Sequence, residues 1–178
     1  MKAVDQCLSW RFRGVLLGCV ITCQLLMVTS AQTDQPCRIH PDSVFQPKDV
    51  QAIDQLLMDW KAVVQNGDLE GLAQLVTEDA EFWSHEAEPL RGRDALKQAF
   101  EPYVNTYRWQ QDYQCSELII AGDWAVIRGT EHNQFQHLTT GQQTSSRQRA
   151  FSVMQRDQTG QWRFARGMSH RPPASESE

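Results

Sequence analysis

Residues 67–80 read GDLEGLAQLVTEDA, and this stretch decides the fold. Gly67 is suited to end a helix, because glycine adopts the left-handed conformation of a helix C-cap without steric conflict. Asp68 can then cap a short second helix. The apolar residues of that second helix recur on one face, at Leu69, Leu72, Leu75 and Val76. The stretch therefore predicts a junction between two consecutive helices.

The segment before this junction has the periodicity of an amphipathic helix. From residue 48 onward, apolar side chains recur at steps of three and four, at Val50, Ile53, Leu56, Leu57, Trp60, Val63 and Val64. After the junction, residues 80–85 alternate as a short strand does. A third helix is predicted after Gly92, with Leu96, Ala99, Phe100 and Tyr103 turned inward.

The second half of the chain changes to strand-like patterns. Segments 107–121, 124–138, 146–156 and 161–170 are separated by turn signals at Gly122-Asp123, Thr140-Gly141 and Thr159-Gly160. Consecutive strands joined by tight turns predict an antiparallel meander. Helices followed by such a meander predict an α+β domain, with the helices on one face of a curved sheet.

The N-terminus has the pattern of a secretory signal peptide. Lys2, Arg11 and Arg13 precede the apolar run 15–28, and a small-x-small pattern allows cleavage after Ala31. The run is shorter than the ~20 residues that a membrane anchor needs, and lipidation at Cys19 is a minor alternative. We expect a signal peptide at 1–31, an extended lead-in at 32–47, one domain at 48–170 and a disordered tail at 171–178, in a periplasmic or secreted protein.

The cysteine count agrees with export, and the net charge limits the class of partner. Of the five cysteines, only Cys37 and Cys115 lie beyond the leader, and an even number in an oxidising compartment favours one disulfide over two free thiols. Such a disulfide would attach the N-terminal segment to the sheet. The net charge of −5 argues against a nucleic acid or an anionic membrane surface as partner.

Three motifs together are similar to one known superfamily. They are the stretch 67–80 quoted above, LRGRDAL at 90–96 and GQWRF at 160–164. In this order they resemble the SnoaL-like and ketosteroid isomerase-like domains of the nuclear transport factor two-like superfamily. The resemblance covers residues 48–170 and implies a cone-shaped half-barrel, in which three helices pack on a curved antiparallel sheet around a pocket. It also implies a homodimer through the outer face of the sheet.

The catalytic positions of ketosteroid isomerase are changed in this chain. By the motif register, the position of the general base falls on Ser84, that of the oxyanion-binding tyrosine on Trp60, and that of the second acid near Ser152. A serine without a neighbouring base cannot remove a proton from carbon, and an indole N–H replaces a phenol poorly. Steroid isomerisation is therefore disfavoured.

His85, one place beyond the base position, is the candidate catalytic acid or base because histidine titrates near neutral pH. The alternative is a solvated histidine at the rim. Candidate ligand contacts are Trp83, Tyr107, Trp124, His132, Arg149, Arg166 and His170. Arg149 could pair with a carboxylate or phosphate, although an exposed strand face would equally explain the arginines and histidines.

Neither a metal nor a cofactor is expected. The histidines form no His-x-His or His-x-x-x-His pair, and no glycine-rich phosphate loop or nucleophile motif is present. The sequence favours an exported domain that binds a small hydrophobic or aromatic molecule, with or without an anionic group. The alternatives are a cofactor-independent isomerase, cyclase or dehydratase that uses His85, and a protein-interaction module.

Overall fold

The computed structural model describes residues 37–84 and 87–172. The predicted signal peptide, the candidate residue His85 and residues 173–178 lie outside the described residues. Within the described part of the chain, we find no helix that combines the length and the apolar character needed to cross a membrane.

The helix boundaries confirm the predicted caps. Helix α1 (Pro47–Asn66) ends at Gly67, whose φ of 67° is left-handed. Helix α2 (Leu69–Gln74) begins at Asp68, whose carboxylate accepts a hydrogen bond of 2.8 Å from the backbone N–H of Gly71. Helix α3 (Gly92–Thr106) begins at Gly92, within the second motif, where a third helix was expected. Local sequence chemistry therefore sets where each helix starts or stops.

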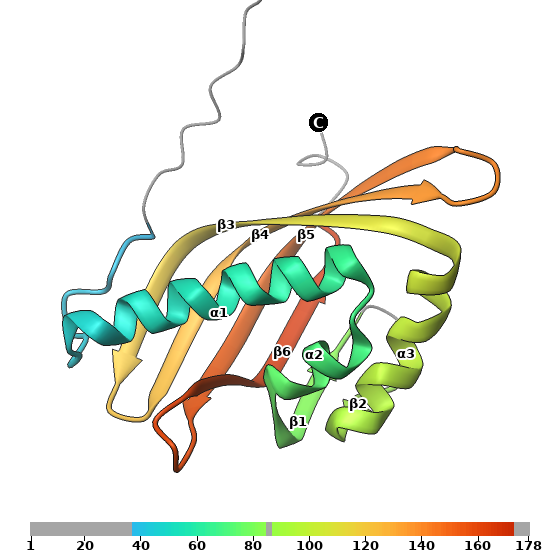
Figure 1. The fold of residues 1–178 in the computed structure, drawn as a ribbon. Helices are drawn as coiled ribbons and strands as arrows, with labels where there is room; N and C mark the ends of the chain where they lie inside the picture. The colour runs from blue at the N-terminus through green and yellow to red at the C-terminus, as the bar shows by residue number, and fades with distance from the viewer. Residues whose placement is uncertain (1–36, 85–86, 173–178) are drawn as a thin grey trace, which may run out of the picture. The chain divides into compact units, whose positions relative to one another are not determined.

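The strands form a single six-stranded sheet in the order β2-β1-β6-β5-β4-β3 (Figure 1). They are β1 (Val76–Trp83), β2 (Leu90–Arg91), β3 (Tyr107–Ala121), β4 (Trp124–His137), β5 (Gln143–Arg156) and β6 (Trp162–His170). The predicted meander β3–β6 is confirmed. The curved sheet is mostly antiparallel, as expected, and β1 pairs with β6 in parallel. The meander returns to β1 with its last strand running in the same direction as β1.

The helices lie over one face of the curved sheet, and α1 crosses the strands of the meander (Figure 1). We call the face toward the helices the inner face and the opposite one the outer face. The buried apolar cluster joins Ile53 and Leu56 of α1, Leu72 of α2 and Leu96 of α3 to Leu118, Ile120, Ile127 and Met154 of the sheet. Each of these large side chains contributes about 1.5–3 kcal/mol through burial.

The lead-in is extended along the free edge of β3. The disulfide Cys37–Cys115 is present, as predicted. Next to it, the N–H of Leu118 donates to the carbonyl of Arg38 at 2.9 Å, and the N–H of Val44 donates to Ile120 at 2.9 Å. The lead-in thus covers strand-edge groups that would otherwise be open to pairing with another chain.

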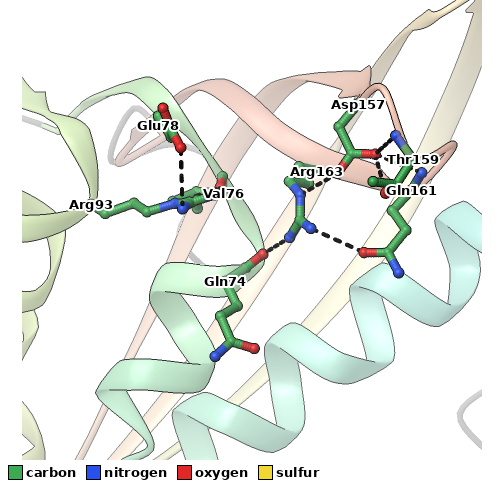
Figure 2. A network of polar contacts seen from close by, with 8 residues as sticks. All are labelled: Gln74, Val76, Glu78, Arg93, Asp157, Thr159, Gln161 and Arg163. Carbon is green, nitrogen blue, oxygen red and sulfur yellow. Dashed lines mark hydrogen bonds and ion pairs between the residues drawn. The ribbon is translucent and has the colours of Figure 1, made fainter.

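The arginine of the third motif joins two parts of the chain. Arg163 of β6 donates to the backbone carbonyl of Gln74 at the end of α2 (Figure 2). It also donates to Asp157 at 2.7 Å and to the side chain of Gln161 at 3.0 Å in the β5–β6 turn. Hydrogen bonds from Thr159 and from Arg163 hold the pKa of Asp157 well below its usual range. The motif arginine therefore fixes the turn against α2.

The arginine of the second motif has a similar structural role. Arg93 of α3 donates from Nε and Nη2 to the carbonyl of Val76, at 3.2 and 3.0 Å (Figure 2). Val76 lies where the register between β1 and β6 shifts. An irregular ladder leaves backbone groups to be satisfied by side chains. Both motif arginines are thus explained by the fold.

We expect Cys115→Ser to lower the free energy of unfolding by about 2–4 kcal/mol, because the disulfide joins residues 78 positions apart and restricts the unfolded chain. Urea unfolding without reductant measures the loss. Cys37→Ser and the double variant should lose the same amount, since each breaks the same bond. A wild-type protein whose unfolding is unchanged by a dithiol reductant would contradict this expectation.

Candidate functional site

Three side chains from neighbouring strands form a polar row in the middle of the inner face. Tyr113 of β3 lies opposite Glu131 of β4, and Glu131 lies opposite Gln148 of β5. We call these residues the Glu131 row. They share strand parity with Ile127 and Ala150, which are buried beneath the helices. Strand alternation therefore places a carboxyl group on the covered side of the sheet.

The adjacent row on the same face is polar as well. Gln111 and Asn133 lie opposite each other and are only 8% and 4% exposed. The indole N–H of Trp60, on α1, donates to Gln111 at 2.7 Å. The indole N–H of Trp109 donates to Asn133 at 2.9 Å. Two tryptophan rings are thereby fixed over the sheet next to Glu131.

Glu131 is the titratable residue of this region whose pKa is shifted toward neutral pH. Burial raises the pKa of its carboxyl group from the usual 4.5 to about 7, although a hydrogen bond from Asn133 works in the opposite direction. Among the described residues, no lysine, arginine or histidine forms an ion pair with Glu131. The carboxyl group is therefore able to gain or lose a proton near neutral pH.

Tyr113 places a second polar group beside Glu131. Its hydroxyl is buried, and no described residue is hydrogen-bonded to it. Burial and then the negative charge of Glu131 raise the pKa of Tyr113, so the phenol stays protonated. The ring lies over Gly129, where a Cβ atom would come within 2.9 Å of the hydroxyl oxygen. Glycine at position 129 thus makes room for Tyr113.

Two surface cavities lie at the ends of α1, away from the Glu131 row. One of about 400 Å³ lies at the start of α1, beside Asp49 and Arg156, and one of about 140 Å³ lies at its end, beside Tyr107. Neither is lined by Glu131 or Tyr113. Among the described residues, no cluster of histidine, cysteine and acidic side chains could hold a metal ion.

Of the predicted ligand contacts, Tyr107 alone lies on the inner face. Its ring packs edge-on against Phe135 and His137 at the end of the β3–β4 hairpin. Six others lie on the outer face, namely Trp83, Trp124, His132, Arg149, Arg166 and His170, as the parity of their buried neighbours shows. An inner-face pocket does not include these six side chains.

The alternation along each strand explains this placement. Phe82 packs over Gly167 on the inner face, so its neighbour Trp83 points outward and is 54% exposed. Ala125 is buried, so Trp124 points outward and is 45% exposed. Asn133 is buried on the inner face, so its chain neighbour His132 points outward, whereas His137 shares the parity of Asn133.

The remaining outward residues lie on β5 and β6. Arg166 donates to the carboxylate of Asp79 at 2.9 Å. Arg149 and His170 lie opposite each other on β5 and β6. Trp60 belongs to the packed core, as its helical spacing predicted. Ser152, the register position of the second acid, lies on the inner face opposite Ile127 and next to Gly167.

Sequence reasoning missed Glu131 and Tyr113. A signal was present, because Glu131 shares parity with Ala125, Ile127 and Asn133. A carboxylate within a set of small and apolar residues of one parity indicates a buried acid. The opposite parity of β4 contains Trp124 and His132, which are equally suited to bind a ligand, so the sequence alone favoured the wrong face.

Comparisons with known proteins agree with this fold. A ketosteroid isomerase-like protein from Erwinia carotovora atroseptica superposes with a TM-score of 0.62 at 17% identity, over 71% of this chain and 98% of that one. A conserved protein from Planctomyces limnophilus gives 0.63 at 21% identity, over 71% and 100%. A candidate scytalone dehydratase from Novosphingobium aromaticivorans gives 0.62 at 20% identity, over 70% and 85%.

These likenesses define the class as a nuclear transport factor two-like cone fold. The sequence model of the SnoaL-like domain matches residues 57–165. The chain therefore belongs to the SnoaL-like domain family. None of the curated proteins matches it.

We expect Glu131→Gln to stabilise the protein at pH 8 by about 1–3 kcal/mol and to have little effect near pH 4. The pKa of the folded state is about 7 and the usual value is 4.5. Between these values the unfolded chain loses a proton that the folded chain keeps, so wild-type stability falls as pH rises through this window. Urea unfolding across pH 4–8 measures it, with exposed Glu101→Gln as control. A stability difference that does not vary with pH would contradict the assignment.

Proposed function

We propose that this chain is a small-molecule-binding domain whose ligand lies against the Glu131 row. One observation carries the proposal: on the covered face, a carboxyl group lies beside a buried phenol, and within residues 37–84 and 87–172 the first has no ion-pair partner and the second no hydrogen bond. Unpaired polar groups in a protein interior reduce stability. A ligand that supplied the missing partners would remove that penalty.

The surroundings favour a ligand that is mostly apolar. Trp60 packs edge-on against Phe100, with ring centroids 6.1 Å apart, and Phe100 packs against Trp109 at 5.1 Å. Aromatic walls with a few placed polar groups are typical of sites for small organic molecules. Movement of the Tyr113 ring away from Gly129 would provide room on the floor of such a site.

A second candidate function is a cofactor-independent enzyme of the dehydratase or isomerase type. Glu131 favours it, because a carboxyl group with a pKa of about 7 can both donate and accept a proton near neutral pH. In a dehydration, one group protonates the departing hydroxyl and another removes a proton from the adjacent carbon. Glu131 and His85 are the candidates for these roles, and His85 lies outside the described residues.

Export and assembly are part of the proposal. The N-terminal pattern and the disulfide Cys37–Cys115 support an exported protein. On the outer face, Trp83, Phe151 and Met168 lie side by side across three strands and are 54%, 43% and 45% exposed. Such an apolar patch supports a homodimer or, as the third candidate function, a protein-interaction surface.

We expect Tyr113→Phe to raise the free energy of unfolding by about 1 kcal/mol, because it removes a buried hydroxyl without a partner. The same change should weaken ligand binding about fivefold or more, since the phenol is one of the groups a ligand would satisfy. Urea unfolding measures stability. Tryptophan fluorescence titration with a panel of small aromatic and alicyclic molecules measures binding.

Trp83→Leu is the matched control, because it truncates an exposed aromatic side chain on the outer face. It should leave the affinity of every panel member unchanged. The proposal fails if Trp83→Leu weakens binding and Tyr113→Phe does not, or if no panel member binds and native mass spectrometry of the purified protein detects no bound small molecule.

A further inference from the structure

We infer that the ligand of the Glu131 row carries a protonated amine on an apolar body, an inference that rests on the function proposed above. The juxtaposition behind it is a carboxyl group that forms no ion pair with any residue the structure describes, set beside three aromatic side chains. The ammonium group would pair with Glu131, and the apolar body would lie against the rings.

The cationic side chains on the inner face of β3, β4 and β5 lie too far from Glu131 to pair with it. Besides Glu131, the inner-face positions of β3, β4 and β5 include two side chains that can be cationic, His137 and Arg156. Arg156 is bound to Asp49 at 2.8 Å. His137 and Arg156 lie about 20 and 25 Å from Glu131, from the rise per residue along the strands. Neither can reach its carboxyl group, so in the described part of the chain β3, β4 and β5 supply no cation to Glu131.

The aromatic side chains favour a cation over a neutral partner. Tyr113 belongs to the Glu131 row, and the rings of Trp60 and Trp109 are hydrogen-bonded to Gln111 and Asn133 in the adjacent row. The faces of tyrosine and tryptophan rings attract cations, most strongly where water is excluded. A carboxylate among such rings is therefore complementary to an ammonium group in charge and in polarisability.

An anionic ligand does not fit this site. The expectation of an anionic group rested on Arg149, which lies on the outer face opposite His170. At the inner face an anion would meet the negative charge of Glu131. The remaining rival is a neutral carbonyl compound, whose oxygen could accept hydrogen bonds from Tyr113 and from protonated Glu131. The two classes respond to pH in opposite directions.

The pH dependence follows from the groups that face Glu131. They are Tyr113 from β3, Gln148 from β5 and Asn133 from its own strand, and Arg128 on the outer face acts on Tyr113 at longer range. Of these, Glu131 alone titrates near neutral pH, with a pKa of about 7. An amine requires the ionised form, so its affinity should rise with pH through this region. A carbonyl compound requires the protonated form, so its affinity should fall.

The experiment compares matched pairs of probes on the mature, oxidised protein by isothermal titration calorimetry. The pairs are benzylamine and benzyl alcohol, 2-phenylethylamine and 2-phenylethanol, and cyclohexylamine and cyclohexanone. For at least one pair we expect the amine to bind about tenfold more tightly at pH 8. At pH 6, measurements in two buffers of different ionisation enthalpy should show release of up to one proton per amine bound. Glu131→Gln should abolish the preference, while His137→Gln should retain it.

Each outcome decides between the two proposals. Tighter binding of the alcohols or the ketone, or an amine preference that persists in Glu131→Gln, overturns the amine inference and leaves small-molecule binding in place. Absence of binding by every probe overturns the amine inference, and the binding panel with Tyr113→Phe then decides the proposed function separately. Proton release in the wild type needs no variant, so the test does not depend on the folding of Glu131→Gln.

Discussion

The packing of α1 across the inner face of the sheet is the interaction on which the rest of the structure depends. Its apolar stripe, with Ile53 and Leu56, covers the half of the face that carries Ile120 and Met154. One turn later the stripe reaches Trp60, whose N–H requires an acceptor and finds it in Gln111. The hydrogen bond from Trp60 to Gln111 therefore places a polar contact of α1 beside the candidate site, while Val64 further along the helix returns to the core.

This arrangement has an energetic consequence. An acid and a phenol that are covered but incompletely paired reduce stability, whereas the apolar cluster and the disulfide Cys37–Cys115 increase it. Proteins commonly keep such unfavourable groups where function needs them. The lead-in, held by the disulfide along β3, stabilises the same strand that carries Tyr113 and Gln111. Rigidity at one end of β3 thus supports a polar site in its middle.

Local chemistry made much of the fold predictable from the sequence. The caps at Gly67 and Asp68 and the meander each follow from a few neighbouring residues, the disulfide was expected from the cysteine count, and the structure contains all of them. The parallel pairing of β1 with β6 was not predictable in this way. This pairing depends on the path of all four strands of the meander, which brings β6 next to β1, and no single segment of the sequence determines that path.

The site was less predictable because parity and face are different kinds of information. Alternation shows which residues of a strand share a face, but only packing decides which face the helices cover. On β4 each parity contains both polar and apolar residues, so Trp124 and His132 were as plausible as Ala125 and Glu131. Register shifts, between Cys115 and Glu117 on β3 and between Val153 and Met154 on β5, interrupt the alternation further.

Family membership narrows the chemistry only when it is combined with this geometry. By the motif register, the catalytic positions of ketosteroid isomerases fall on Ser84, on Trp60 and near Ser152, and Trp60 packs in the core. The group able to exchange a proton instead lies on β4, in the middle of the sheet. A cone fold surrounds its inner face with strands, so an acid on any of them can reach a ligand in the same space. The fold therefore allows the residue that exchanges a proton to lie on different strands in different proteins. In such chains, the buried titratable residues are the first indication of the site.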